Sequence, residues 1–297
     1  MISTLLSMEL RKAFDGAPFK IALAVGVLLG LASAGLYVFW FLGFSVGSDG
    51  SVINLGVIDL AVQPDYYGML YLSSPYVRMM SLDGMAAASS LFYVLVPLLC
   101  LVPYAWSYRT ELSGGYLAQV YSRATRRSYY RAKAAATFAS AFVVVLVPQV
   151  VNFIVLCCIF PLYTPTPVDA LYTAIIGSDP WARLYYSVPW LYTALYFLVS
   201  SSLAGLWATL VLAVSLLVSN RVVLLVGPYL VLWIVSAVWN EVFSSLGLWA
   251  PELGLSGLMR MAGGAFHSNP WVMLMEGAFF ALIAWLVPRR RLGGDVL

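Results

Sequence analysis

Long apolar runs alternate with shorter polar segments along this chain. Six of the runs are long enough to cross a bilayer, because a helix needs about 20 apolar residues to span the hydrocarbon core. The expected spans lie at about residues 19–44, 86–106, 134–160, 189–218, 222–239 and 271–287. We therefore predict an all-α membrane protein, a polytopic six-helix transmembrane bundle that forms one domain over residues 1–297.

Residues 1–18 precede the first run and show the pattern of an amphipathic helix. Leu5 and Leu6 lie on an apolar stripe, Glu9 lies beside it, and Gly16 ends the helix. We expect this segment to lie on the inner membrane surface as an interfacial helix.

The segment between the second and third runs, residues 107–133, concentrates positive charge. It holds six of the sixteen Lys and Arg residues. With the six spans in place, 13 Lys and Arg residues fall on the same side of the membrane as this segment and 3 fall on the other. Because cytoplasmic loops are enriched in Lys and Arg, the pattern predicts that residues 107–133 and both termini face the cytoplasm.

Within this segment a turn separates two short helical stretches. Gly114 and Gly115 give the backbone the freedom to turn. After them, Leu117, Val120 and Tyr121 stand at i, i+3 and i+4, so they form one apolar stripe on a short helix. No bilayer is available to bury this stripe, and we expect another surface to cover it.

The composition excludes a soluble globular domain. Hydrophobic residues make up 62% of the chain and charged residues 10%, and the mean hydropathy is +0.89. The net charge of +3 is small and suggests no nucleic-acid partner. Cys100, Cys157 and Cys158 all lie in apolar runs, so we expect neither a disulfide nor a metal site from them.

The chain contains no recognisable catalytic motif. It has no GxxxxGK[ST] loop to hold ATP phosphates, no HExxH or GxSxG motif and no His/Cys cluster, and its one histidine is His267. We expect no catalytic residues, no metal and no cofactor bound by this chain, and no enzyme activity of its own. If the protein is an ATP-driven pump, its motor is another polypeptide.

A few polar residues fall inside the expected spans. Glu276 lies about five residues from the outer end of the sixth span, where it either has a function inside the membrane, reaches the membrane interface or sits protonated in the bundle. Gln149 and Asn152 stand one turn apart in the third span, which favours hydrogen bonding between helices over a substrate site. Gly26 and Gly30 form a small-xxx-small pair that predicts close helix packing in the first span.

Prolines predict kinks in two of the spans. Pro97 and Pro103 lie in the second run and Pro228 follows Gly227 in the fifth. Each proline removes a backbone hydrogen bond, so we expect both helices to bend there.

The order of residues in the segment 107–133 resembles the cytoplasmic loop of ABC-2 type permeases, the membrane subunits of certain ATP-binding-cassette transporters. The residues that carry this resemblance are Glu111, Gly115, Ser122–Arg123, Arg126–Arg127 and Lys133. In that family an acidic residue and a glycine precede a short coupling helix, and a Ser/Arg-rich turn and a lysine follow it. The family also resembles this chain in its N-terminal elbow helix and in an outer re-entrant element before the sixth span.

The resemblance implies a function and a set of partners. It implies the permease subunit of a bacterial exporter in the cytoplasmic membrane, paired in the lipid bilayer with a second permease subunit as a homodimer or heterodimer. Separate ATPase subunits would bind ATP and Mg²⁺ and dock on the coupling helix. The docking residues would be Glu111, Gly115, Leu117, Val120, Tyr121, Arg123, Arg126 and Arg127.

Two alternatives stay open from the sequence alone. An ion-coupled secondary transporter typically has inverted repeats and charged or broken helices in mid-membrane, and neither is detected here. A non-transporting membrane scaffold has no distinguishing pattern. The resemblance favours the exporter over both.

Overall fold

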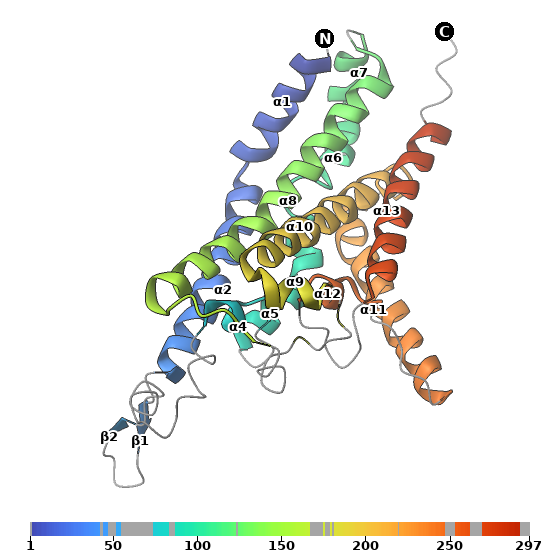
Figure 1. Cartoon of the computed structure of the whole chain (residues 1–297). Coiled ribbons are helices and arrows are strands. Elements are labelled where there is room, and N and C mark those ends of the chain that lie inside the picture. Colours follow the sequence, from blue (N-terminus) through green and yellow to red (C-terminus); the bar gives the residue numbers. More distant parts are fainter. Residues whose placement is uncertain are drawn as a thin grey trace.

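The computed structural model describes a helical protein with one short β-hairpin (Figure 1). The described residues are 2–41, 44–46, 52–54, 74–82, 87–122, 124–166, 175, 179, 181–218, 220–246, 253–261 and 269–291. The helices are α1 (Ile2–Asp15), α2 (Ala17–Phe41), α4 (Pro75–Arg78), α5 (Ala87–Leu99), α6 (Ser107–Ser113), α7 (Tyr116–Tyr121), α8 (Arg126–Ile159), α9 (Ala182–Ser187), α10 (Pro189–Val214), α11 (Arg221–Ser245), α12 (Leu255–Leu258) and α13 (Pro270–Arg291). Strands β1 (Phe44–Val46) and β2 (Val52–Asn54) pair antiparallel.

Five of the described helices are long and apolar enough to cross a membrane, namely α2, α8, α10, α11 and α13. They match the first, third, fourth, fifth and sixth predicted spans. The prediction of a multi-pass helical membrane protein is therefore confirmed at this level. Helix α8, which matches the third predicted span, is longer than predicted. It begins at Arg126, after the N-cap Thr125, and not at Ala134.

The second predicted span, residues 86–106, is not one continuous helix. Helix α5 has 13 residues, and tight turns follow it as far as α6. The break comes near the two prolines of the run. The Leu101 amide bonds to the Leu98 carbonyl and leaves the Pro97 carbonyl to the indole N–H of Trp207, 2.9 Å away. A side chain from α10 thus satisfies the backbone group that the irregular turn releases.

Helix α8 lies at the centre of the bundle and packs against α1, α2 and α10 (Figure 1). Gly26 and Gly30 of α2 form the close contact that their spacing predicts. A Cβ added at Gly26 would stand 2.7 Å from Pro148 Cγ, and one at Gly30 would stand 3.0 Å from the Pro148 carbonyl oxygen. Pro148 of α8 therefore fits against a surface that only glycine can provide.

The predicted N-terminal helix is present as α1, which precedes α2 and lies alongside α8 (Figure 1). Ala13 is fully buried and joins Leu10 in a cluster with Tyr104 and Ala136. Glu9 is also buried, with 2% of the residue exposed. The face of α1 that packs against the rest of the protein therefore includes Glu9, although the amphipathic pattern placed Glu9 beside the apolar stripe and not on it.

Candidate functional site

Helices α6 and α7 stand together with α1 and the first turns of α8 at one end of the molecule, here called the α1–α7 end (Figure 1). Gly114 ends α6, and Gly115 has a φ of 73°, a left-handed conformation that favours glycine. The predicted diglycine turn is thus confirmed. It allows α7 to fold back against α6 and α8.

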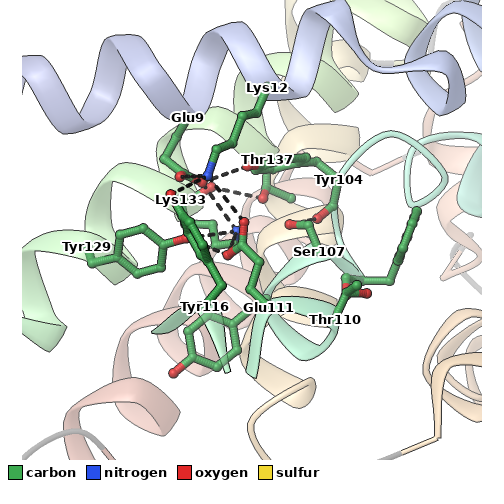
Figure 2. Close-up of polar contacts among 12 residues, drawn as sticks. Glu9, Lys12, Tyr104, Ser107, Thr110, Glu111, Tyr116, Tyr129, Lys133 and Thr137 are labelled. Atoms are coloured by element: carbon green, nitrogen blue, oxygen red, sulfur yellow. Dashed lines mark hydrogen bonds and ion pairs between the residues drawn. The ribbon is translucent and has the colours of Figure 1, made fainter. Parts of the chain in front are cut away.

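Four charged side chains from three parts of the chain meet at this end (Figure 2). Lys133 Nζ lies 3.2 Å from Glu9 Oε2 and also pairs with Glu111 Oε2. Lys12 Nζ lies 3.2 Å from Glu9 Oε1 and 3.5 Å from Glu111 Oε1. We call these four residues the ion-pair cluster. It joins α1, α6 and α8.

Tyrosines complete the hydrogen bonding of the cluster (Figure 2). The Tyr104 hydroxyl donates to Glu9 Oε2 at 2.6 Å, and the Tyr129 hydroxyl donates to Glu111 Oε2. Lys12 donates to the hydroxyl oxygen of Tyr116 on α7 at 3.1 Å. Each carboxylate therefore has both cationic and hydroxyl partners, which is the arrangement that makes a buried charge tolerable.

The centre of the cluster is inaccessible to water. The side chain of Lys133 is 0% exposed and that of Glu9 is 2% exposed, whereas Glu111 and Lys12 are 17% and 36% exposed. Removing one member of a buried pair leaves an uncompensated charge and typically costs about 3–5 kcal/mol. The cluster therefore fixes the relative positions of the three segments that carry it.

The surroundings shift the ionisation of both residues of α1. Burial opposes the charged form of Glu9, but Lys133, the Tyr104 hydroxyl and Lys12 outweigh it and lower the pKa of Glu9 below its ordinary value of 4.5. Burial likewise opposes the charge of Lys12, but the bond to Tyr116 and the two carboxylates raise its pKa above 10.5. Both residues stay charged at neutral pH.

The apolar stripe of α7 is covered by this chain itself. Leu117 is 2% exposed and belongs to a buried cluster with Tyr108, Tyr129, Tyr130 and Leu212. The two other residues of the stripe, Val120 and Tyr121, are partly buried against the same cluster. The docking interpretation expects an ATPase to cover this stripe, whereas in this structure α6, α8 and the end of α10 cover it.

The other predicted docking residues have different surroundings. Glu111 turns inward to the ion-pair cluster. The Arg126 guanidinium lies over the Tyr121 ring at 5.3 Å from its centroid, and Arg127 is exposed. Gly115 is exposed at the turn, and Arg123 lies outside the described residues.

A groove of about 610 Å³ opens between α1 and α7. Leu5, Met8 and Val120 contribute apolar walls, and Glu9 and Tyr129 line the groove where it meets the ion-pair cluster. The remaining lining consists of Ala124 and four polar residues, namely Thr4, Tyr116, Gln119 and Ser122. The groove presents mainly apolar surface to an occupant, and its two buried polar side chains, Glu9 and Tyr129, already have partners in this chain.

The polar residues predicted inside the spans lie away from this end. Gln149 donates to the Tyr93 hydroxyl at 3.2 Å and accepts from Ser200 at 3.1 Å. Asn152 accepts from the Met80 amide and donates to the Gly30 carbonyl. Both amides therefore connect separate segments of the bundle. The third residue, Glu276, is half-buried on α13.

Sequence reasoning did not assign five of the groups that meet at the ion-pair cluster to a site, namely Glu9, Lys12, Tyr104, Tyr116 and Tyr129. One local signal was present for the first of these. Ala13 stands one turn after Glu9, and a small residue on the same helical face allows close approach of another helix. The tyrosines gave no such signal, because tyrosine is also common at membrane interfaces.

Comparison of the chain with protein families, with curated proteins and with solved structures finds no match. Among the described residues there is also no group of three or more His, Cys, Asp or Glu side chains that could hold a metal ion. The site is thus defined by its own geometry. It consists of the ion-pair cluster and the mainly apolar groove beside it, at one end of a multi-pass membrane protein.

Proposed function

We propose that the chain is the membrane-spanning permease subunit of an ATP-binding-cassette exporter in a bacterial cytoplasmic membrane. Two permease subunits form the translocation path in the lipid bilayer, and separate ATPase subunits bind ATP and Mg²⁺. Both termini and residues 107–133 face the cytoplasm. One observation carries the proposal: at the end of the bundle the ion-pair cluster ties α6 to α1 and α8, and the hydrogen bond between Lys12 and Tyr116 adds α7.

The cluster provides a route from α7 to the spanning helices. Tyr116 of α7 bonds to Lys12 of α1, and Lys12 and Lys133 both pair with Glu111 of α6. Lys133 belongs to α8, which packs against α2 and α10. Buried ion pairs are costly to separate, so a displacement of α6 and α7 carries α1 and α8 with it. In this proposal, ATP-driven motion of the ATPase subunits displaces α6 and α7, and α1 and α8 move with them.

The docking surface in this proposal is the exposed side of α7 together with the groove beside it. Leu117 supports α7 from inside, and Ala118 and Gln119 face outward. An apolar side chain of the ATPase fits the groove between α1 and α7, because the walls are mainly apolar and the charge of Glu9 beside them is paired with Lys12 and Lys133. The exposed Arg127 lies at the start of the neighbouring helix.

Substitution on the exposed side of α7 tests the docking. Ala118→Trp adds a large side chain to the proposed contact without touching the buried Leu117. We expect the tagged variant, purified from its native membranes, to lose at least about 90% of an associated P-loop ATPase, since disrupting a central contact costs more than 1.4 kcal/mol. Vanadate-sensitive ATP hydrolysis in the preparation should fall in parallel.

Two matched variants control this experiment. Ala118→Ser keeps the small side chain and should retain the ATPase. Arg290→Trp places the same bulk on the exposed last turn of α13 and should also retain it. Full ATPase recovery with Ala118→Trp would show that α7 does not dock the motor.

A further inference from the structure

Two short segments from distant parts of the chain meet inside the bundle, away from the α1–α7 end. They are residues 74–82, which include α4, and residues 254–261, which include α12; Figure 1 shows both helices on the side of the bundle away from α1 and α7, and Ser81 and Met261 are the point of contact. Four methionines of these segments are 0% exposed, namely Met79, Met80, Met259 and Met261. The rest of the chain therefore covers both segments, α4 against α8 and α10 and α12 against α5, and we call the two segments the plug.

The two halves of the plug are joined by a backbone hydrogen bond. The Met261 amide donates to the Ser81 carbonyl at 3.0 Å. The Ser81 hydroxyl also lies 3.4 Å from the Met261 sulfur, which is a weak acceptor. This pairing joins a segment that follows the first span to a segment that precedes the last.

Side chains of the spanning helices hold each half in place. The Tyr196 hydroxyl of α10 bonds to the carbonyl oxygens of Leu258, at 3.0 Å, and Arg260. On the other half, Asn152 of α8 accepts from the Met80 amide at 2.9 Å. Tyr196 and Asn152 each stand seven residues from the nearer end of their helices, about 10 Å at helical rise. The plug thus reaches well into the bundle.

The chemistry of the plug suits a part that moves. Each of its helices has four residues, so neither half spans the bundle or forms a long helix contact. Methionine side chains are flexible and can repack against different neighbours at little cost. The bonds to Tyr196 and Asn152 come from side chains, which can exchange a backbone partner for water when water enters.

We propose that residues 74–82 and 254–261 form a movable plug that closes the end of the bundle opposite α7, with the Tyr196 hydroxyl as its latch. In the observed state the plug is shut. Opening separates the two halves at the contact between Ser81 and Met261 and admits water to the released carbonyl and amide groups, which have no other partner in an apolar medium. In the proposed exporter this opening releases cargo, but the motion itself is independent of the ATPase.

Thiol labelling tests the motion directly. The protein carries Met80→Cys, with Cys157→Ala and Cys158→Ala, and is treated in sealed membrane vesicles with a membrane-impermeant maleimide. Met80 is 0% exposed, so only an open plug allows the reagent to reach it. We expect slow labelling of position 80 and a rise of about five- to tenfold with Tyr196→Phe, which removes the latch. Labelling should come from the membrane face opposite that at which Thr125→Cys reacts.

Two internal controls separate opening of the plug from general loosening. Tyr192→Phe removes a buried hydroxyl one turn away on α10, for which the described part of the structure gives no hydrogen-bond partner, and should leave the rate unchanged. The retained native Cys100 is 1% exposed and should stay unlabelled, as peptide mass spectrometry would show. No labelling of position 80 in any variant, or an equal rise at Cys100 with Tyr196→Phe, overturns the proposal. No outcome depends on an ATPase, so failure here is distinct from failure of the proposed docking.

Discussion

At the scale of single residues, Lys133 and its two carboxylate partners hold α1, α6 and α8 together. Lys133 is fully buried and touches Glu9, Glu111 and the Tyr129 hydroxyl. Its position in the sequence, at the start of an apolar run, identified it as a residue near the membrane boundary. Its partners could not be predicted, because they are 22 and 124 residues away and only the packing of α1 and α6 against α8 brings them together.

Replacing Lys133 should expose the cost of unpaired buried charge. Lys133→Met removes the buried one of the two lysines that Glu9 and Glu111 share and leaves the half-exposed Lys12, so we expect a loss of about 3–5 kcal/mol in unfolding free energy. Adding Glu9→Gln should recover part of this loss, because Lys12 can still pair with Glu111. Equilibrium unfolding in mild detergent measures both. Additive losses in the double variant would show that Glu9 and Lys133 are not coupled.

The acid side of the stability profile should depend on Glu9. Its pKa is lower in the folded state than the ordinary value of 4.5, so its contribution to stability is present above pH 4.5 and is lost as the pH falls through the lower folded-state pKa. We expect wild-type thermal stability to fall below pH 4.5 more steeply than that of Glu9→Gln. Thermal melts between pH 3 and 7 compare the two proteins, and parallel curves would contradict this assignment.

At the scale of helices, hydropathy predicted five of the six spans, because each of those helices is a single long apolar run. The prediction that the second run, residues 86–106, forms one continuous helical span was wrong. Its composition is as apolar as the others, but the prolines interrupt it and Trp207 from α10 bonds to the released carbonyl. Sequence indicated the bend through Pro97 and Pro103, and only the tertiary contact explains why the chain continues as turns.

The contact between α2 and α8 can be tested at one glycine. Gly26→Ala places a Cβ 2.7 Å from Pro148 Cγ, too close for either ring or backbone to keep its position. We expect a loss of about 1–3 kcal/mol from overpacking. Detergent unfolding again provides the measurement.

Gly35→Ala is the matched control in the same helix, since no atom lies within 4 Å of an added Cβ there. It should be neutral or stabilising by up to about 1 kcal/mol through helix propensity. Equal effects of the two substitutions would argue against a close packing of α2 on Pro148.

At the scale of the whole molecule, the two ends of the bundle have different chemistry. The α1–α7 end has the ion-pair cluster, an apolar groove and exposed arginines. The other end contains the methionine-rich plug. The charge pattern predicts that the first end is cytoplasmic, and the proposed exporter assigns the motor to that end and release of cargo to the other. The plug itself could not be predicted from sequence, because its halves are more than 170 residues apart.

Photo-crosslinking from α7 in native membranes tests the proposed coupling most directly. A photoreactive amino acid at Gln119, exposed beside the groove, should crosslink a single protein that contains a P-loop, and the same amino acid at Arg290 should not. ATP with vanadate should change the crosslinking yield, because the proposed motor moves α7 during its cycle. If position 119 crosslinks only lipid, or crosslinks the same proteins as position 290, then α7 is not the contact with a separate ATPase.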